Sequence, residues 1–409
     1  MKVTSMQVVD KWIGVPLCFV LTCARRLGGW FRTPSAPQNP RRILFMEISE
    51  MGSMVLAYPL FRRVRELFPE AELYFLTFRQ NRHAIDILGV LPEENVLTLD
   101  GERPLQFVAS TWSVLRSLRK KRMDIVLDME LFARFTAALS WLSGGRARIG
   151  YHRFHNEGLY RGDLLTHRVL YNPHIHTAYN LLNLIHAFTS PPEELPHAKL
   201  PIPPEELPIP AYAAPEEEQN TVRAKIETLA PGDAAGMRII LLNPNASDLI
   251  HLRRWPVDNY ITLAERLLGS DDRIVLITGT PAEHDQAERI KESVGSPRCI
   301  NFAGQTTFTE LLALYSIADV LVTNDSGPVH FSSLTRTRTL ALFGPETPDL
   351  YGPLGENCRV AYAGYACSPC VSAFNHRRSP CSDNRCLQAL TVERVLADVE
   401  ALLLPDPSC

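Results

Sequence analysis

A predicted buried strand, followed by a tight turn and a helix start, lies between Asp319 and His330 and strongly constrains the fold of this chain. Residues 320–323 (Val-Leu-Val-Thr) are apolar or β-branched, which is typical of a strand covered on both faces. Turn formers follow at 324–327, and Pro328 suits the first position of a helix because its missing N–H would be unpaired there. This succession predicts a parallel α/β sheet whose carboxyl-edge loop can bind a ligand.

The loop after this strand carries side chains suited to a phosphorylated sugar. Free N–H groups at a helix start attract phosphate, Ser326 adds a hydroxyl group, and Gly327 permits close approach of the backbone. Asp325 and His330 can each bind a hydroxyl group of a sugar or a ribose. The alternative is an ordinary strand–helix loop without a ligand, and the local pattern alone does not decide between the two.

Apolar runs elsewhere predict further strands separated by helices. In the first half of the chain they lie at 42–48, 72–78, 95–99, 123–129 and 147–152. In the second half they lie at 238–242, 273–278, 320–323 and 339–343. Thr307 and Glu310 have the spacing of a capping box and predict the start of a helix.

Two motifs stand close together in the second half, Asn-Asp-Ser-Gly-Pro-x-His at 324–330 and Leu-Phe-Gly-Pro-x-Thr at 342–347. Five shorter motifs precede them in order, at 42–45, 49–55, 147–150, 243–247 and 253–256. Over about residues 41–390 the set resembles glycosyltransferase family 9, the ADP-heptose:lipopolysaccharide heptosyltransferases and their relatives. The resemblance implies an α/β GT-B fold, in which two Rossmann-like domains with parallel sheets face a central cleft. It also implies inverting sugar transfer that requires no cofactor.

Length and composition agree with two α/β domains. With 409 residues and 45% hydrophobic content, the chain can bury two cores, and its net charge of −3 argues against a nucleic-acid partner. Nine prolines between 191 and 215 favour an extended linker. We therefore expect a membrane-associating segment, an acceptor-side domain, a proline-rich linker, a nucleotide-sugar-binding domain, and a C-terminal helix with a tail, at 1–40, 41–190, 191–235, 236–390 and 391–409.

The N-terminus carries an uncharged stretch at 12–24, followed by Arg25 and Arg26. This stretch is too short to span a bilayer. It is therefore either a peripheral or monotopic anchor on the cytoplasmic face of the inner membrane, or a helix docked on the protein's own surface. A basic cluster at 116–122 either faces anionic lipid or ends a solvated helix.

The family resemblance also points to a donor site. Inverting transfer needs groups that stabilise the leaving nucleotide diphosphate, and Arg253 stands where the family usually has lysine. Glu283 either contacts the ribose or base of the nucleotide or caps a helix start near Pro281. The predicted donor-binding residues are Asn245, Ser247, Arg253, Arg254, Glu283, Asn324, Asp325, Ser326, Gly327 and His330.

The catalytic base is the point at which this sequence departs from the family. The family pattern places an aspartate, the expected base, after the glycine of the first loop, and that position is Ser53 here. A serine hydroxyl group has little basicity without a partner. Glu50 in the same loop is our predicted base, with the alternative that it only caps the following helix. Other candidate bases nearby are Glu47, Asp128 and Glu130.

Four cysteines lie close together in the C-terminal region, at Cys367, Cys370, Cys381 and Cys386. Their spacing resembles that of a structural zinc site. Free thiols and two disulfides are the alternatives, and disulfides are disfavoured in the cytosol.

Three functions fit the sequence to different degrees. The first is transfer of a sugar, such as heptose, from ADP-heptose or a similar donor to a lipopolysaccharide or other envelope glycan. The second is a non-catalytic family member that binds a nucleotide or glycan as an assembly subunit, which Ser53 supports. The third, a nucleotide-sugar epimerase of the same fold, needs carboxylate-rich loops that the sequence lacks.

Overall fold

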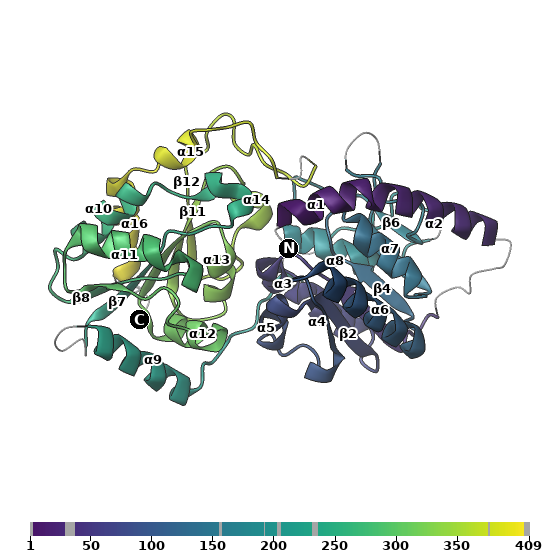
Figure 1. Cartoon of the computed structure of the whole chain (residues 1–409), viewed down its shortest axis with the longest axis horizontal. Helices are drawn as coiled ribbons and strands as arrows, with labels where there is room; N and C mark the ends of the chain where they lie inside the picture. Colours follow the sequence, from purple (N-terminus) through teal and green to yellow (C-terminus); the bar gives the residue numbers. More distant parts are fainter. Residues whose placement is uncertain are drawn as a thin grey trace. The chain divides into compact units, whose positions relative to one another are not determined.

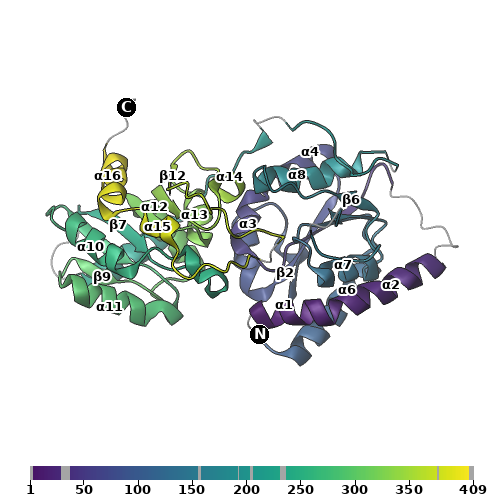
Figure 2. The same cartoon turned by 90° about the horizontal axis from the view of Figure 1, so that it is seen from above.

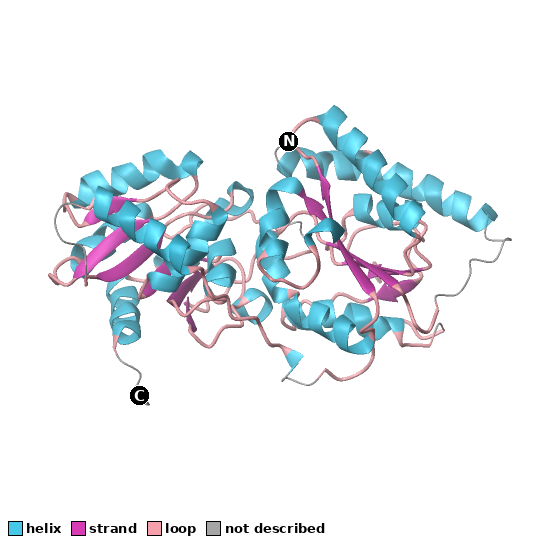
Figure 3. Cartoon of the chain, turned by 90° about the horizontal axis from the view of Figure 1, so that it is seen from below, coloured by secondary structure: helices cyan, strands magenta, loops and turns pink. Residues whose placement is uncertain are grey.

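The computed structural model describes residues 3–28, 37–154, 158–191, 193–202, 206–230, 236–374 and 377–404. The chain divides into two compact units, Met1–Pro208 and Ile209–Cys409. Each unit contains one parallel six-stranded sheet between layers of helices (Figures 1 and 3). This confirms the predicted α/β class with two Rossmann-like domains.

The sheet of the first unit has the strand order β3-β2-β1-β4-β5-β6, and every neighbouring pair is parallel. Its strands are β1 (Arg42–Met46), β2 (Glu72–Phe78), β3 (Val96–Leu99), β4 (Ile125–Asp128), β5 (Ala147–Tyr151) and β6 (His167–Val169). All residues of β4 are buried, as the uninterrupted apolar pattern predicts for a strand covered on both faces.

Helices cover both faces of this first sheet. They are α3 (Met51–Leu56), α4 (Tyr58–Leu67), α5 (Arg82–Asp86), α6 (Pro104–Lys121), α7 (Arg134–Leu142) and α8 (Thr177–Phe188). Helices α4 and α8 pack together on one face, while α6 and α7 lie on the other (Figure 2). There the rings of Phe107 and Phe135, 5.1 Å apart, join α6 to α7.

Two N-terminal helices, α1 (Val3–Trp12) and α2 (Gly14–Gly28), pack along the outside of α7 (Figure 2). The Asp10 carboxylate accepts hydrogen bonds from the backbone N–H groups of Arg134 (3.0 Å) and Phe135 (2.9 Å), so it caps α7. Arg25 forms an ion pair with Asp163 at 2.7 Å. Helices α1 and α2 therefore dock on the protein's own surface, which is one of the two alternatives for the N-terminal segment. No described helix is both long enough and apolar enough to cross a membrane.

The second unit repeats the same topology with the strand order β12-β11-β10-β7-β8-β9. Its strands are β7 (Arg238–Asn243), β8 (Arg273–Ile277), β9 (Cys299–Asn301), β10 (Val320–Asn324), β11 (Arg338–Phe343) and β12 (Cys358–Tyr362). Its core gathers apolar side chains from the sheet and from the helices against it, including Leu242, Trp255 and Val322.

The helices of the second unit are α9 (Glu216–Leu229), α10 (Val257–Leu267), α11 (His284–Val294), α12 (Phe308–Ile317), α13 (Gly327–Ser332), α14 (Pro348–Tyr351), α15 (Arg385–Gln388) and α16 (Val392–Leu403). Thr307 and Glu310 form the predicted capping box at the start of α12. Helix α9 lies inside the stretch predicted as a linker, and Lys225 ties it to Glu310 at 2.8 Å. The final helix α16 packs against α10, β10 and β11.

Candidate active site

In each sheet, the direction in which successive strands are added reverses at one position, the switch point. Predicted site residues lie at these switch points. The second and third strands of each unit lie on one side of its first strand, and the fourth strand lies on the other side. The first and fourth strands form the pairs β1 with β4 and β7 with β10. In open α/β sheets the carboxyl ends of such a pair form the crevice that binds ligands.

In the second unit, Asn324 at the end of β10 holds three segments together. Its side-chain oxygen accepts hydrogen bonds from the Trp255 backbone N–H (2.9 Å) and the Tyr260 hydroxyl (3.2 Å). Its amide donates to the backbone oxygen of Asn245 (3.2 Å). The side-chain amide of Asn245 in turn donates to the backbone oxygen of Thr278 (3.1 Å). The structure thus uses the amides of Asn324 and Asn245 to shape the site.

Arg253 and Asp325 meet at this edge from segments 72 residues apart. The closest guanidinium nitrogen lies 3.5 Å from an Asp325 carboxylate oxygen, and the side chains are 13% and 4% exposed. Nε of Arg253 has no hydrogen-bond partner among the described residues. A mostly buried guanidinium group with unused donors is suited to bind an anion. Its neighbour Arg254 instead donates twice to the backbone oxygen of Ala246, at 3.1 and 2.6 Å.

The other predicted donor residues discussed here lie in the segments that follow β7 and β10. The hydroxyl group of Ser326 donates to the Asn324 carbonyl at 3.1 Å, and His330 is buried. Ser247 is exposed on the loop after β7. Helix α13, which begins at Gly327, has only six residues, so the charge available for a phosphate resides mainly on Arg253.

Glu283 acts as a helix cap in this structure. Its carboxylate accepts hydrogen bonds from the backbone N–H of Thr280 (2.6 Å) and from the Thr280 hydroxyl (2.9 Å), which completes a capping box. Helix capping is the alternative to nucleotide binding that the sequence left open for Glu283. Sequence patterns did not indicate Glu346, which is 2% exposed in the loop after β11 and brings a further carboxyl group to this edge of the sheet.

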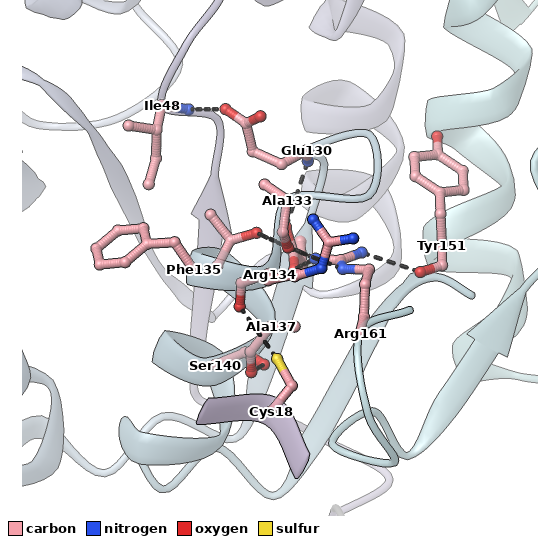
Figure 4. A network of polar contacts seen from close by, with 12 residues as sticks. Cys18, Ile48, Glu130, Ala133, Arg134, Phe135, Ala137, Ser140, Tyr151 and Arg161 are labelled. Carbon is pink, nitrogen blue, oxygen red and sulfur yellow. Dashed lines mark hydrogen bonds and ion pairs between the residues drawn. The ribbon is translucent and has the colours of Figure 1, made fainter. Parts of the chain in front are cut away.

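In the first unit, acidic side chains gather where β1 and β4 end. The Glu130 carboxylate accepts a hydrogen bond from the backbone N–H group of Ile48 at 2.7 Å (Figure 4). It accepts another from the backbone N–H group of Ser49, also at 2.7 Å. Asp128 is fully buried and pairs with the buried guanidinium group of Arg161. Sequence reasoning missed Arg161, because it lies outside every motif. Glu130 and Asp128 are thus already engaged within the protein.

Glu47 and Glu50 lie in the loop after β1, and Ser53 lies in the following helix α3. Glu47 is 4% exposed, and its burial, followed by the charges of Glu130 and Glu50, raises its pKa well above the usual range. Glu50 occupies the N-cap position of α3 but forms no capping hydrogen bond through its side chain. The hydroxyl group of Ser53 donates to the Glu50 carbonyl at 2.8 Å.

The expectation of a structural zinc site at the four cysteines is not supported. Among the described residues, no group of three Cys, His, Asp or Glu side chains could hold a metal ion, and His376 lies outside them. Cys386 is buried beside Gly344, while Cys367 is exposed. Cys370 and Cys381 pack against the apolar side chains of Ile250, Leu252 and Val371. None of the four cysteines forms a disulfide.

These environments predict an order of reactivity for the thiols. Burial raises the pKa of Cys386 from 9.0 to about 11, which lowers its thiolate fraction near pH 8 by about a hundredfold. We expect a small alkylating reagent to modify exposed Cys367 first and Cys386 last, as read by mass spectrometry of peptides. If all four thiols were protected together, and a chelator abolished that protection, the result would contradict this expectation and support a metal site.

Two Rossmann-like units, each with polar side chains at its switch point, define the GT-B fold of glycosyltransferases. The solved E. coli ADP-heptose LPS heptosyltransferase II has the same fold over 88% of this chain and 98% of its own, with a TM-score of 0.68 and 22% identity. Residues 111–378 match glycosyltransferase family 9 (heptosyltransferase). The chain belongs to this family.

Curated relatives are similar over different lengths. Lipooligosaccharide heptosyltransferase 2 of Campylobacter jejuni subsp. jejuni serotype O:2 is 28% identical over 171 residues, 41% of this chain and 52% of that protein. Lipopolysaccharide heptosyltransferase 3 of E. coli K12 is 22% identical over 376 residues, 87% of this chain and 96% of that protein. The chain spans about half the length of the Campylobacter jejuni relatives that it matches. The family match begins after the segment that carries Glu50 and Ser53.

Proposed function

We propose that this protein is an inverting glycosyltransferase that moves a sugar, heptose in the first instance, from a nucleotide diphosphate sugar to lipopolysaccharide or another envelope glycan. The observation that carries the proposal is the Arg253 guanidinium group, mostly buried at the β7–β10 switch point with an unused donor. Family membership and the names of the relatives support ADP-heptose as the donor.

The residues at this switch point suit departure of a diphosphate. When the acceptor oxygen attacks the anomeric carbon, the bond from that carbon to the diphosphate breaks and negative charge grows on the leaving group. Arg253 offsets that charge, and Asp325 orients Arg253 from 3.5 Å away. The hydroxyl groups of Ser247 and Ser326 and the N–H of Gly327 are candidate hydrogen-bond donors to the phosphate oxygens. In the family the transfer needs no cofactor.

A transfer assay tests this proposal directly. The full chain is incubated with ADP-heptose and a lipopolysaccharide acceptor that lacks its outer heptose, and the acceptor is then analysed by mass spectrometry. We expect the acceptor to gain the mass of one heptose residue. Nucleotide binding without any transfer would instead favour the second candidate, a non-catalytic assembly subunit. The serine at position 53, where the family pattern has aspartate, supports this candidate.

We also propose that the protein works on the cytoplasmic face of the inner membrane as a peripheral protein. On α1 and α2 the outward side chains of Trp12, Phe19 and Val20 are 73%, 60% and 60% exposed. The single acidic residue of these two helices, Asp10, faces α7. Nearby α6 has no acidic residue, ends in basic residues and exposes Trp112 by 61%. Apolar and aromatic side chains with basic neighbours suit a surface of anionic lipid.

This location predicts binding to vesicles that depends on α2. Replacing both Phe19 and Val20 with aspartate should reduce flotation of the protein with phosphatidylethanolamine–phosphatidylglycerol vesicles by about tenfold or more, because each buried apolar side chain contributes about 1.5–3 kcal/mol. Leu229→Asp, on α9 of the other unit and 41% exposed, is the matched control and should float like the wild type. Equal flotation of all three proteins would count against the proposed location.

A further inference from the structure

We propose that Asn384, the residue directly before α15, positions Arg253 for sugar transfer. Its side-chain amide holds the backbone on both sides of Arg253 and so keeps the guanidinium group in place for the diphosphate. This role of Asn384 rests on the proposed sugar transfer. It makes the 384–390 segment part of the donor site, although none of the donor-binding residues predicted from the sequence lies in that segment.

Asn384 reaches the Arg253 segment from a distant part of the chain. Its Nδ2 donates hydrogen bonds to the backbone oxygens of Leu252 (3.1 Å) and Arg254 (2.9 Å), which are the neighbours of Arg253 on either side. The backbone N–H of Arg254 also donates to the His251 carbonyl at 3.1 Å. Because a peptide group is planar, holding the Leu252 oxygen and the Arg254 N–H fixes both peptide groups next to Arg253. The direction in which the arginine side chain leaves the backbone is thereby set.

The side-chain contacts of Arg253 do not fix its guanidinium group by themselves. The closest nitrogen lies 3.5 Å from Asp325, which is long for a hydrogen bond, and Nε has no partner among the described residues. A guanidinium group that can turn must lose that freedom when a diphosphate binds, and this loss weakens binding. A fixed backbone limits the loss, so the cation is preorganised for the charge that grows on the leaving group.

The backbone of Asn384 has a conformation that few residue types adopt. Its φ of 35° and ψ of 45° lie in the left-handed region, which asparagine and glycine enter more readily than other residues. Its carbonyl accepts a hydrogen bond from the backbone N–H of Leu387 (2.9 Å) at the start of α15. The Gln388 amide donates to Oδ1 of Asn384 at 3.3 Å, so the nitrogen end of the Asn384 amide faces the two carbonyls. Asparagine therefore meets both requirements at this position, a left-handed backbone and a donor of two hydrogen bonds.

The core of the second unit holds the segment after Asn384 in place. The indole N–H of Trp255, which is 0% exposed, donates to the Leu390 carbonyl at 2.8 Å. Leu387 is also buried, and a Cβ atom added to Gly344 would lie only 2.6 Å from its Cγ. Gly344 begins the loop after β11, at the carboxyl edge of the sheet. The segment is thus packed against the site itself and gives Asn384 a rigid support.

The first test measures ADP binding and sugar transfer by the full chain with the substitution Asn384→Gly. Glycine keeps the left-handed backbone and removes the amide. We expect the dissociation constant for ADP, measured by calorimetry, to rise about tenfold, because Arg253 is no longer held in advance. The initial rate of transfer should fall about tenfold or more for the same reason.

Asn357→Ala is the matched control for this substitution. The Asn357 amide likewise donates to backbone oxygens, those of Ser332 (3.4 Å), Thr335 (3.0 Å) and Thr337 (2.6 Å), but directly before β12 at the amino edge of the sheet. We expect its ADP dissociation constant and transfer rate to stay within about twofold of the wild type. The melting temperature of each variant shows that the losses are measured on folded protein. An equal loss of ADP binding in both variants would overturn the positioning role.

A double variant shows whether Asn384 acts through Arg253. Adding Asn384→Gly to Arg253→Ala should change the transfer rate by no more than about twofold, because the group that Asn384 positions is already gone. A further loss of about tenfold in the Arg253→Ala background would mean that the two residues act independently, and would overturn the positioning role.

The outcomes also separate this role from the proposed function. Normal ADP binding and transfer in Asn384→Gly would overturn the positioning role alone and leave the proposed function intact. Absence of both ADP binding and transfer in the wild type would overturn the proposed function, and the positioning role with it.

Discussion

Replacing Arg253 with alanine should lower the rate of sugar transfer by about a hundredfold or more, equivalent to about 2.7 kcal/mol of lost transition-state stabilisation. The guanidinium group is the main cation available at the β7–β10 switch point, since Arg254 is held by Ala246. The substitution also leaves the Asp325 side chain, 4% exposed, without its cation. Binding of the nucleoside diphosphate should weaken as well, because the negative charge of the Asp325 carboxylate repels phosphate once the guanidinium group is gone.

Arg253→Lys is the matched control for this substitution. Lysine keeps the charge that the family usually has at this position but loses the planar fork of donors. We expect the lysine variant to keep transfer within about tenfold of the wild type, measured as initial rates of nucleotide release. An alanine variant as active as the lysine variant would show that Arg253 does not contact the diphosphate.

Replacing Asp128 with asparagine should lower the free energy of unfolding by about 3–5 kcal/mol, because it leaves the Arg161 charge buried without a counter-charge. Both side chains of this pair are 0% exposed. The measurement is urea unfolding followed by circular dichroism. Glu66→Gln is the control, since the Arg62–Glu66 pair is 57% and 45% exposed, and its loss should cost less than about 1 kcal/mol. Equal stability of the two variants would contradict a paired buried charge.

The sequence predicted the strands that are continuous apolar runs and missed those that are short or exposed. The predicted strand at 72–78 coincides with β2, in which six of seven residues are buried. Three strands were not predicted. β6 and β9 have only three residues each, and the edge strand β12 has one buried residue, so none shows a clear apolar run. Helix α9 was placed in the linker because prolines precede it, although its three glutamates at 216–218 favour a helix start.

For the site, local sequence indicated the loop after β10 but not its contacts. The turn at 324–327 follows from residue types, whereas the contact of Arg253 with Asp325 depends on how β7 and β10 pair. Likewise, the direction of the Glu47 side chain cannot be read from a strand end. Asn324 was predicted as a donor-binding residue, but the sequence could not show that its side-chain oxygen accepts hydrogen bonds from the Trp255 backbone N–H and the Tyr260 hydroxyl group. Long-range packing decides each of these points.

The N-terminal segment illustrates why two alternatives from sequence need not exclude each other. One side of α1 and α2 docks on α7 through Asp10, and Cys18 is 0% exposed. The other side leaves Trp12 and Phe19 exposed. An amphipathic helix has two faces, so the same segment can pack on the protein and still present an apolar surface.

The most direct test of the central claim, that the β7–β10 switch point binds a nucleotide diphosphate, is titration calorimetry of the full chain with ADP, UDP, GDP and CMP. We expect micromolar binding of ADP, selective over the other three nucleotides, that is lost in Arg253→Ala and largely kept in Arg253→Lys. Absence of binding to any of the four nucleotides, or binding that is unchanged in Arg253→Ala, would contradict it.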